Sequence, residues 1–233
     1  YAAFISLGLP DAILGAAWPS MQPQMAVPVS FAGIISMIIS IGTVVSSLLS
    51  DRLNRKFGTG PVTAVSVFMT AAALFGFSLS GEFWMLCILA VPYGLGAGAV
   101  DAALNNYVAL HYSSRHMSWL HCFWGIGASA GPYIMGLCLR SRLGWQSGYR
   151  TIAIAQFILT AALFFSLPLW KKADKSLKSN NGSSGDNGAD KPVGFISSVK
   201  IRGVPLIMLA FFSYCAFEST AGLWASSYFV SCH

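Results

Sequence analysis

Long apolar runs, separated by short polar segments, dominate the pattern of hydrophobic and polar positions along this chain. An α-helix needs about 20 mostly apolar residues to cross the hydrocarbon core of a bilayer, and the runs reach that length. They lack the alternation of apolar and polar residues that is typical of membrane β-barrels. We therefore predict an all-α membrane protein with seven spans, at residues 2–21, 28–50, 60–80, 83–110, 118–139, 149–169 and 204–230.

The composition agrees with a multi-pass integral membrane protein. Hydrophobic residues make up 55% of the chain and charged residues 9%, whereas soluble domains carry roughly 25% charged residues. The five cysteines lie singly in apolar segments, without the spacing of a metal site or a disulfide framework. Because no nucleophile–base or metal-ligand arrangement is visible either, we expect neither an enzyme nor a bound cofactor.

The distribution of basic residues predicts the orientation in the membrane. Eleven of the 14 Lys and Arg residues fall on the side that holds the segments after the second, fourth and sixth spans. The more basic side of a membrane protein faces the cytoplasm, so we expect a cytoplasmic N-terminus, in the inner (plasma) membrane of a bacterium. This bias accounts for the net charge of +6 without a nucleic-acid partner.

A change of composition after the sixth span predicts a domain boundary. Residues 171–200 include SNNGSSGDNGADKP, which has no apolar face and is typical of a flexible cytoplasmic linker. Residues 1–170 then form a six-helix bundle, and residues 201–233 hold the first helix of a second bundle. Because the chain begins without Met and inside an apolar run, we expect it to be a fragment of a longer protein.

Two short segments indicate an internal repeat. The sequences DAIL at residues 11–14 and DAAL at residues 101–104 lie in the first and fourth spans. These spans are equivalent when a six-helix bundle consists of two inverted three-helix repeats. We therefore predict that arrangement for the six-helix bundle.

Acidic residues inside the apolar spans are the main candidates for function. Asp11, Asp101 and Glu218 lie in the first, fourth and seventh spans, and no Lys or Arg lies inside any span to pair with them. An intramembrane acid is costly unless it is protonated, binds an ion or faces water. Such acids are suited to carry protons or to line a solute site. The alternative is a structural role, in which a protonated acid bonds to a neighbouring helix.

Polar and aromatic residues share helical faces with these acids. In the fourth span, Gly94, Gly98 and Asn105 fall on the face of Asp101, and the glycines allow another backbone to approach closely. Acids, amides and aromatic rings together suit a polyhydroxylated solute, while packing or interfacial anchoring is the alternative for the tryptophans. Besides the acids, the candidate solute- or proton-binding residues are Trp18, Gln22, Asn105, His121, Trp124, Tyr214 and Trp224.

The fifth span contains the sequence GIGASAGPYIMG. Its Gly127 and Gly131 form a small-xxx-small pair, which is typical of close helix packing in membranes. Packing alone explains these residues.

The segment SDRLNRKFG after the second span carries a recognisable motif. It resembles G-x-L-x-D-R-x-G-R-K, the loop between helices two and three of the major facilitator superfamily. The resemblance implies the major facilitator fold, with a loop that latches the cytoplasmic ends of the two halves together. The matching residues are Asp51, Arg52, Arg55 and Lys56, and Ser47 and Asn54 stand where the family usually has glycine.

Three further segments resemble the fucose–galactose–glucose:proton symporters within that superfamily. They are VDAALNNYV, LHCFWGIGASAGP and FSYCAFESTAGLWASSYF, in the fourth, fifth and seventh spans. By this resemblance Asp101 replaces a glutamate of helix four, and Asp11 corresponds to an aspartate of helix one that acts in transport. The resemblance implies a secondary active transporter that moves a small polar solute, a sugar, by alternating access coupled to protons.

Alternatives to this interpretation remain open. Sodium can replace the proton as coupling ion. The G-x-x-x-G-P of the fifth span also resembles a motif of proton-coupled antiporters, so efflux of drugs or metabolites is a second function. A seven-helix receptor is a third, although the seventh span has no Lys for a retinal Schiff base.

Overall fold

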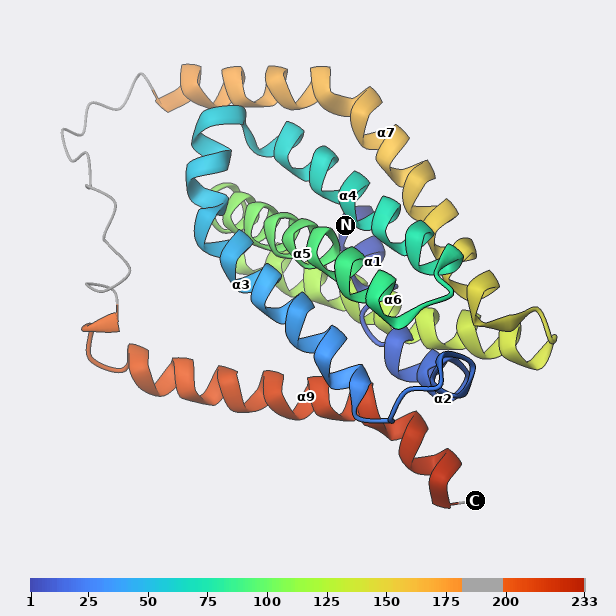
Figure 1. The fold of residues 1–233 in the computed structure, drawn as a ribbon. Coiled ribbons are helices and arrows are strands. Elements are labelled where there is room, and N and C mark those ends of the chain that lie inside the picture. The colour runs from blue at the N-terminus through green and yellow to red at the C-terminus, as the bar shows by residue number, and fades with distance from the viewer. Residues whose placement is uncertain (182–198, 233) are drawn as a thin grey trace.

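The computed structural model describes residues 1–181 and 199–232, and nearly all of them are helical (Figure 1). Within these residues, seven segments are long and apolar enough to cross a membrane, and α1 and α2 together form the first. The predicted all-α class and its seven spans are therefore confirmed. The helices in chain order are α1 (Ala2–Gly8), α2 (Ile13–Met25), α3 (Phe31–Phe57), α4 (Thr59–Leu79), α5 (Phe83–His111), α6 (Ser114–Arg140), α7 (Gly144–Asn181) and α9 (Val204–Cys232).

The end of α3 differs from the prediction. We expected a loop at residues 51–58, but α3 continues through this segment to Phe57. Arg, Asn and Lys are compatible with a helix, so the basic motif by itself does not end one. Gly58 ends it with φ of +85°, a conformation that other residues rarely adopt, and α4 starts at once.

The end of α7 also differs from the prediction. The linker was expected from residue 171, but α7 is helical to Asn181. Lys, Ala and Leu are good helix formers, and extending an existing helix is far easier than starting one. The rest of the predicted linker, residues 182–198, lies outside the described residues, and the division of the chain into domains stays a prediction.

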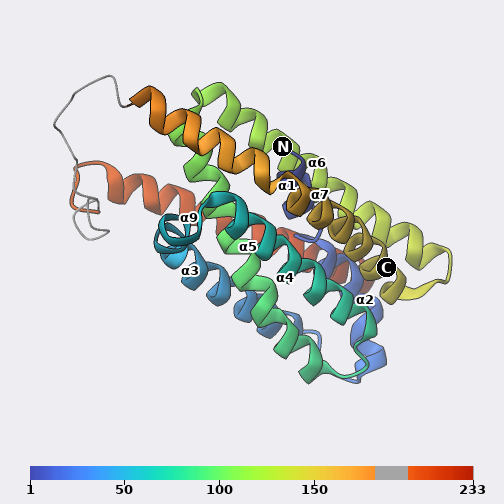
Figure 2. The same ribbon diagram turned by 90° about the horizontal axis from the view of Figure 1, so that it is seen from above.

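The helices pack in pairs that follow the predicted repeat. The most extensive contacts join α3 with α5, α4 with α7, α4 with α5, and α1 with α6 (Figures 1 and 2). Exchanging spans one to three with spans four to six converts the α1·α6 pair into the α5·α3 pair, as inverted repeats require. Outside this bundle, α9 runs along one side and contacts α2.

Glycines bring two of these helix pairs into close contact, as the sequence predicted. A Cβ atom at Gly94 or Gly98 of α5 would overlap backbone atoms of α3, and one at Gly127 or Gly131 of α6 would overlap backbone atoms of α1 or of the residue just after it. The α3·α5 contact is also bonded, because the hydroxyl of Ser46 donates to the carbonyl oxygen of Leu95 at 2.5 Å. Small residues thus supply the close approach that packing in a membrane needs.

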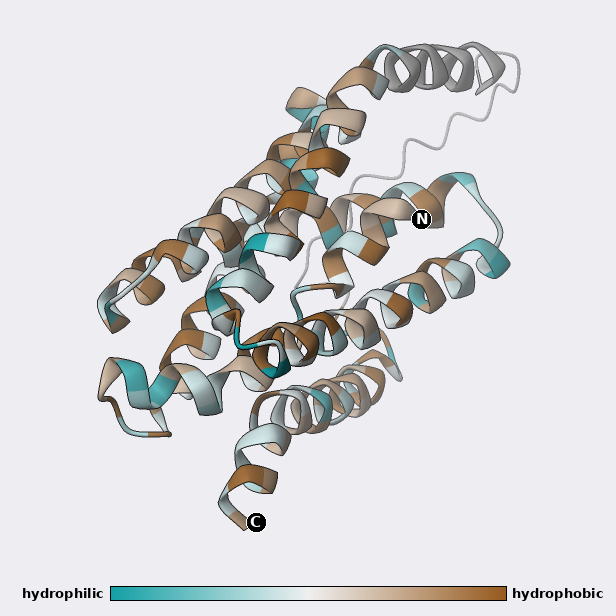
Figure 3. Cartoon of the chain, turned by 90° about the vertical axis from the view of Figure 1, so that its right-hand side faces the viewer, coloured by the Kyte–Doolittle hydropathy of each residue, from teal (hydrophilic) through white to brown (hydrophobic). Residues whose placement is uncertain are grey.

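Hydrophobic residues occur along the whole length of the helices, and hydrophilic residues gather at several helix ends (Figure 3). Leu48, Ile88 and Ile158 each expose about 60% of their surface or more. In a soluble protein such an exposed apolar surface would be unusual. In a membrane protein it is the surface that contacts lipid.

Candidate functional site

The first membrane span is broken around Asp11. Helix α1 ends at Gly8 and α2 begins at Ile13, so Asp11 lies between two short helices. Pro10 has no backbone N–H to continue the α1 ladder, and the Asp11 N–H instead bonds to the carbonyl oxygen of Gly8 at 3.1 Å. The prediction of one continuous first span is therefore wrong at this point, and Asp11 does not share a helix with Trp18 and Gln22.

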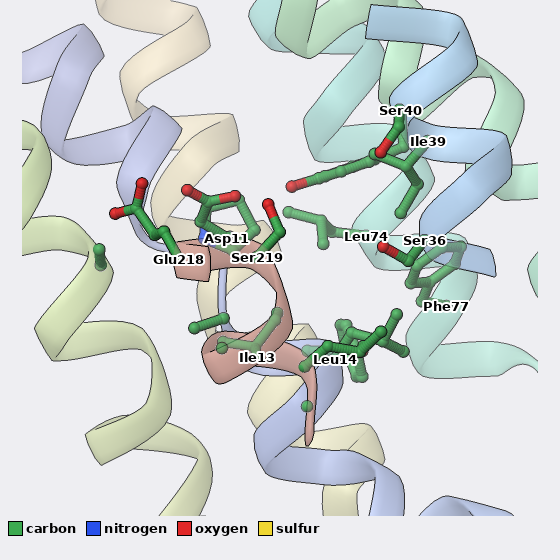
Figure 4. A pocket seen from close by; sticks show the side chains of 18 of the residues that line it. Asp11, Ile13, Leu14, Ser36, Ile39, Ser40, Leu74, Phe77, Glu218 and Ser219 are labelled. Atoms are coloured by element: carbon green, nitrogen blue, oxygen red, sulfur yellow. The ribbon is translucent and has the colours of Figure 1, made fainter. Parts of the chain in front are cut away.

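A cavity of about 200 Å³ opens beside this break (Figure 4). It is bounded by the break itself and by residues of α2, α3, α4, α5, α6, α7 and α9. Interrupted membrane helices are a recurrent way of building a solute site near the middle of a bilayer. The polar or aromatic residues that line it are Asp11, Ser36, Ser40, Phe77, Tyr93, Trp124, Tyr149, Glu218 and Ser219.

Two carboxylates give the cavity its charge. Asp11 and Glu218 reach it from the break and from α9, and they are close enough to interact electrostatically (Figure 4). Among the described residues that line the cavity there is no Lys or Arg. The two acids are therefore held near one another without a basic partner, so they are available to protons, cations or solute hydroxyls.

Hydroxyl groups line the wall opposite these acids. Ser36 and Ser40 lie on α3, at positions four apart that share one helical face. Tyr93 comes from α5, and its ring stacks on Phe77 at 6.3 Å between centroids. Hydroxyls both donate and accept hydrogen bonds, so this wall is suited to a polar solute.

Tyr149 of α7 is a lining residue that the sequence analysis missed. Its side chain is 1% exposed, and its hydroxyl is buried without a hydrogen-bond partner in the described residues. The ring is fixed edge-on by Phe77 at 5.5 Å and by Trp145 at 6.0 Å between centroids. A tyrosine near the start of an apolar span is also typical of interfacial anchoring, so the sequence pattern did not distinguish it.

Asp101 lies within the unbroken helix α5 and does not line the cavity. Its carboxylate accepts a hydrogen bond from Asn105 Nδ2 at 2.9 Å, one helical turn away. It also interacts electrostatically with His121 of α6 and with Asp11. The structure thus brings two predicted residues, Asp101 and Asn105, into one bonded pair outside the cavity wall.

The remaining candidates divide into one lining residue and several that lie elsewhere. Trp124 lines the cavity, whereas Trp18 is fully buried and donates from its indole N–H to the Val29 carbonyl oxygen at 2.8 Å. Trp224 packs against the apolar core. Packing therefore accounts for two of these three tryptophans. Gln22, His121 and Tyr214 do not line the cavity either.

The basic motif forms the last turns of α3. Asp51 and Arg55 make an ion pair within the helix, four residues apart and largely exposed. Lys56 lies over the ring of Phe57, 5.2 Å from its centroid, and Arg52 is exposed at the same helix end. Asp51 and the three basic residues are thus gathered at one end of the bundle, where the predicted latch stays a prediction.

Metal binding finds no support in the part of the chain that the structure describes. Within residues 1–181 and 199–232, no group of three or more His, Cys, Asp or Glu residues is placed to hold an ion.

A family model matches almost the whole chain. The model of the Major Facilitator Superfamily covers residues 1–232. This agrees with the seven apolar helices and with the basic motif at the end of α3.

Individual relatives are more distant. Synaptic vesicle glycoprotein 2C of Rattus norvegicus is 27% identical over 175 residues, which are 69% of this chain and 23% of that protein. Bypass of stop codon protein 6 of Saccharomyces cerevisiae is 24% identical over 243 residues, 97% of this chain and 48% of that protein. Uncharacterized transporter y4wD of Sinorhizobium fredii is 25% identical over 134 residues, 53% of this chain and 36% of that protein. The chain thus spans between about a quarter and a half of each of these relatives.

Proposed function

The chain belongs to the Major Facilitator Superfamily, and from this premise we propose that its protein is a secondary active transporter of a small polar solute, a sugar, driven by protons. The chain supplies the six helices of one half and the first helix of the other, and α9 closes one side of the cavity. Alternating access then exposes the cavity to one side of the membrane at a time. A seven-helix receptor is not favoured by this family membership.

The observation that carries the proposal is the composition of the cavity wall. Asp11 and Glu218 supply acceptors, Ser36, Ser40 and Tyr149 supply hydroxyls, and aromatic rings lie beside them. Sugar hydroxyls need both donors and acceptors, and the apolar face of a sugar ring packs on aromatic rings.

We further propose that Asp101 carries the coupling proton. It lies outside the cavity wall but interacts electrostatically with Asp11, so a change of its charge changes the field at the solute site. The hydrogen bond from Asn105 stabilises the charged form of Asp101, so this residue has a partner when its proton is released.

A second function has its own support. The cavity holds two acids, no Lys or Arg among its described lining residues, and apolar side chains such as Leu74 and Phe77. This combination also suits an organic cation with an apolar body, which a proton-coupled antiporter would export. The cytoplasmic N-terminus and the bacterial plasma membrane expected from the sequence stay predictions under either function.

The experiment that separates these functions is transport by the full-length protein in proteoliposomes. We expect radiolabelled glucose, galactose or fucose to accumulate when an inward proton gradient is imposed, and the accumulation to collapse with a protonophore. The sugar symporter is wrong if none of these hexoses enters, while a proton gradient drives the movement of a cation such as ethidium in the direction opposite to that of the protons. Empty liposomes and the double variant Asp11→Asn with Asp101→Asn are the controls.

A further inference from the structure

The break in the first span removes the helical hydrogen-bond partner of the Ser6 backbone carbonyl. In a continuous α-helix the carbonyl oxygen of Ser6 accepts from the N–H of the residue four positions on. That residue is Pro10, which has no N–H. A backbone carbonyl without a hydrogen bond is costly inside a membrane, where no water replaces the lost partner.

The side chain of Gln156 occupies the place of that missing donor. Its Nε2 atom donates to the Ser6 carbonyl oxygen at 2.7 Å, reaching from α7 to α1. Gln156 is 1% exposed, so this bond forms in a site that is closed to solvent. The buried amide thus replaces the backbone bond that Pro10 removes.

A second bond fixes the orientation of the amide. The hydroxyl of Thr70 on α4 donates to the Oε1 atom of Gln156 at 3.0 Å. It shares this proton with the carbonyl oxygen of Val67, which lies 2.8 Å away in the same helix. Because Oε1 accepts from Thr70, Nε2 is turned toward Ser6. The amide therefore ties α1 to the closely packed α4·α7 pair just before the break.

Proline alone does not explain the break. Pro92 lies inside α5, Pro132 inside α6 and Pro19 inside α2, and each of these helices is continuous. What distinguishes Pro10 is that a side chain from another helix bonds to the carbonyl it leaves free.

We infer that Gln156 is a positioning residue, which holds the first span open at the break and thereby keeps Asp11 in the cavity. It does not line the cavity beside the break itself. The link between Gln156 and transport rests on the proposed function of Asp11. The effect of Gln156 on the break is independent of that function.

The first test is a double-mutant cycle on thermal unfolding of the full-length protein in detergent, which needs no solute. Gln156→Leu leaves the Ser6 carbonyl unbonded, and we expect the Tm to fall by about 5 °C. Pro10→Ala supplies an N–H for that carbonyl, so in the Pro10→Ala background the same substitution should change the Tm by less than about 2 °C. Equal losses in both backgrounds would overturn the inference, because Gln156 would then act independently of the break.

A matched control comes from the same helix. Thr160 is also buried on α7, but its hydroxyl bonds only to the Gln156 backbone carbonyl oxygen, at 2.8 Å, within α7. Thr160→Val removes a buried hydrogen bond without touching α1. We expect its effect on the Tm to be the same with and without Pro10→Ala. If Gln156→Leu does not yield folded protein, Gln156→Met, with an unbranched side chain of similar length, takes its place.

The second test follows the position of the break directly. Ala12 lines the cavity beside Asp11, and Ala12→Cys in a cysteine-free background reports its accessibility to a membrane-impermeant, cationic methanethiosulfonate reagent. We expect Gln156→Leu to change the rate of modification by about tenfold and Thr160→Val to leave it unchanged. An unchanged rate in Gln156→Leu would show that the amide does not position the break. If the wild type moves no hexose, the proposed function fails, while both of these tests still decide the role of Gln156.

Discussion

Asp11 and Asp101 begin the similar segments DAIL and DAAL, in the first and fourth spans. These two spans are equivalent in the repeat, but the course of their backbones differs. In the first span Asp11 lies in a break between α1 and α2, with an exposed side chain that lines the cavity. In the fourth span Asp101 lies in the middle of one continuous helix and is bonded to Asn105. The same short sequence thus gives one acid that faces the cavity and one that is set beside it.

The difference teaches that the backbone around an acid, rather than the four-residue segment it begins, decides what it contacts. Pro10 precedes Asp11 and Val100 precedes Asp101. The break after α1 turns Asp11 toward the cavity, whereas the helix at Asp101 keeps its backbone bonds and places Asn105 one turn away as a hydrogen-bond partner. We assign solute contact to Asp11 and proton coupling to Asp101 on this basis.

The largest expected effect comes from making the first span resemble the fourth. Pro10→Ala restores the N–H that a continuous helix needs, so we expect Asp11 to leave the cavity and the uptake of hexose to fall by about tenfold or more. Pro92→Ala is the control, since α5 is already continuous around Pro92. Equal losses in the two variants, measured as initial uptake rates in proteoliposomes, would contradict the importance of the break.

A second comparison concerns the contact between α2 and α9. A Cβ atom at Gly15 would overlap the carbonyl oxygen of Gly222, whereas a Cβ at Gly222 would meet only the Ala12 side chain, at an ordinary 3.8 Å. We expect Gly15→Ala to slow transport by about tenfold. The added methyl group overpacks the contact between α2 and α9 at a cost of about 1–3 kcal/mol, so the two helices can no longer pack this closely. Gly222→Ala should transport at a normal rate. The reverse order of effects would show that the contact is not part of the transport cycle.

A smaller effect is expected at the unpartnered hydroxyl in the cavity wall. Tyr149→Phe removes a hydroxyl that bonds to nothing in the described residues, so the fold should lose no stability. If that hydroxyl binds the solute, the KM for hexose rises by about fivefold at an unchanged maximal rate. Tyr133→Phe is the control, since Tyr133 is 68% exposed and does not line the cavity. A KM that stays the same in Tyr149→Phe would exclude this contact.

Only a small effect on stability is expected at the basic motif. The Asp51–Arg55 pair is exposed and lies within one helix, so Asp51→Asn should change the free energy of unfolding by at most about 0.5 kcal/mol. If the motif latches the two halves together, the uptake rate nevertheless falls. A normal rate together with normal stability would remove the latch from the account.

Some of these features could be predicted from the sequence and others could not. Apolar length defines a membrane span, so the predicted spans 60–80 and 83–110 agree closely with α4 and α5. Asp11 and Glu218 could be identified because an acid is rare inside a span. The break could not, since it depends on Pro10 together with Gln156 from a distant part of the chain. Tyr149 could not either, because packing alone decides where its hydroxyl lies.

The most direct test of the proposed division of roles compares Asp11→Asn with Asp101→Asn in proteoliposomes that hold the full-length protein. Each variant is assayed for gradient-driven uptake of the hexose that the wild type transports and for counterflow exchange, which needs no net proton movement. We predict that Asp101→Asn loses gradient-driven accumulation but keeps counterflow, while Asp11→Asn loses both as its KM rises. Intact gradient-driven uptake in Asp101→Asn would contradict the account.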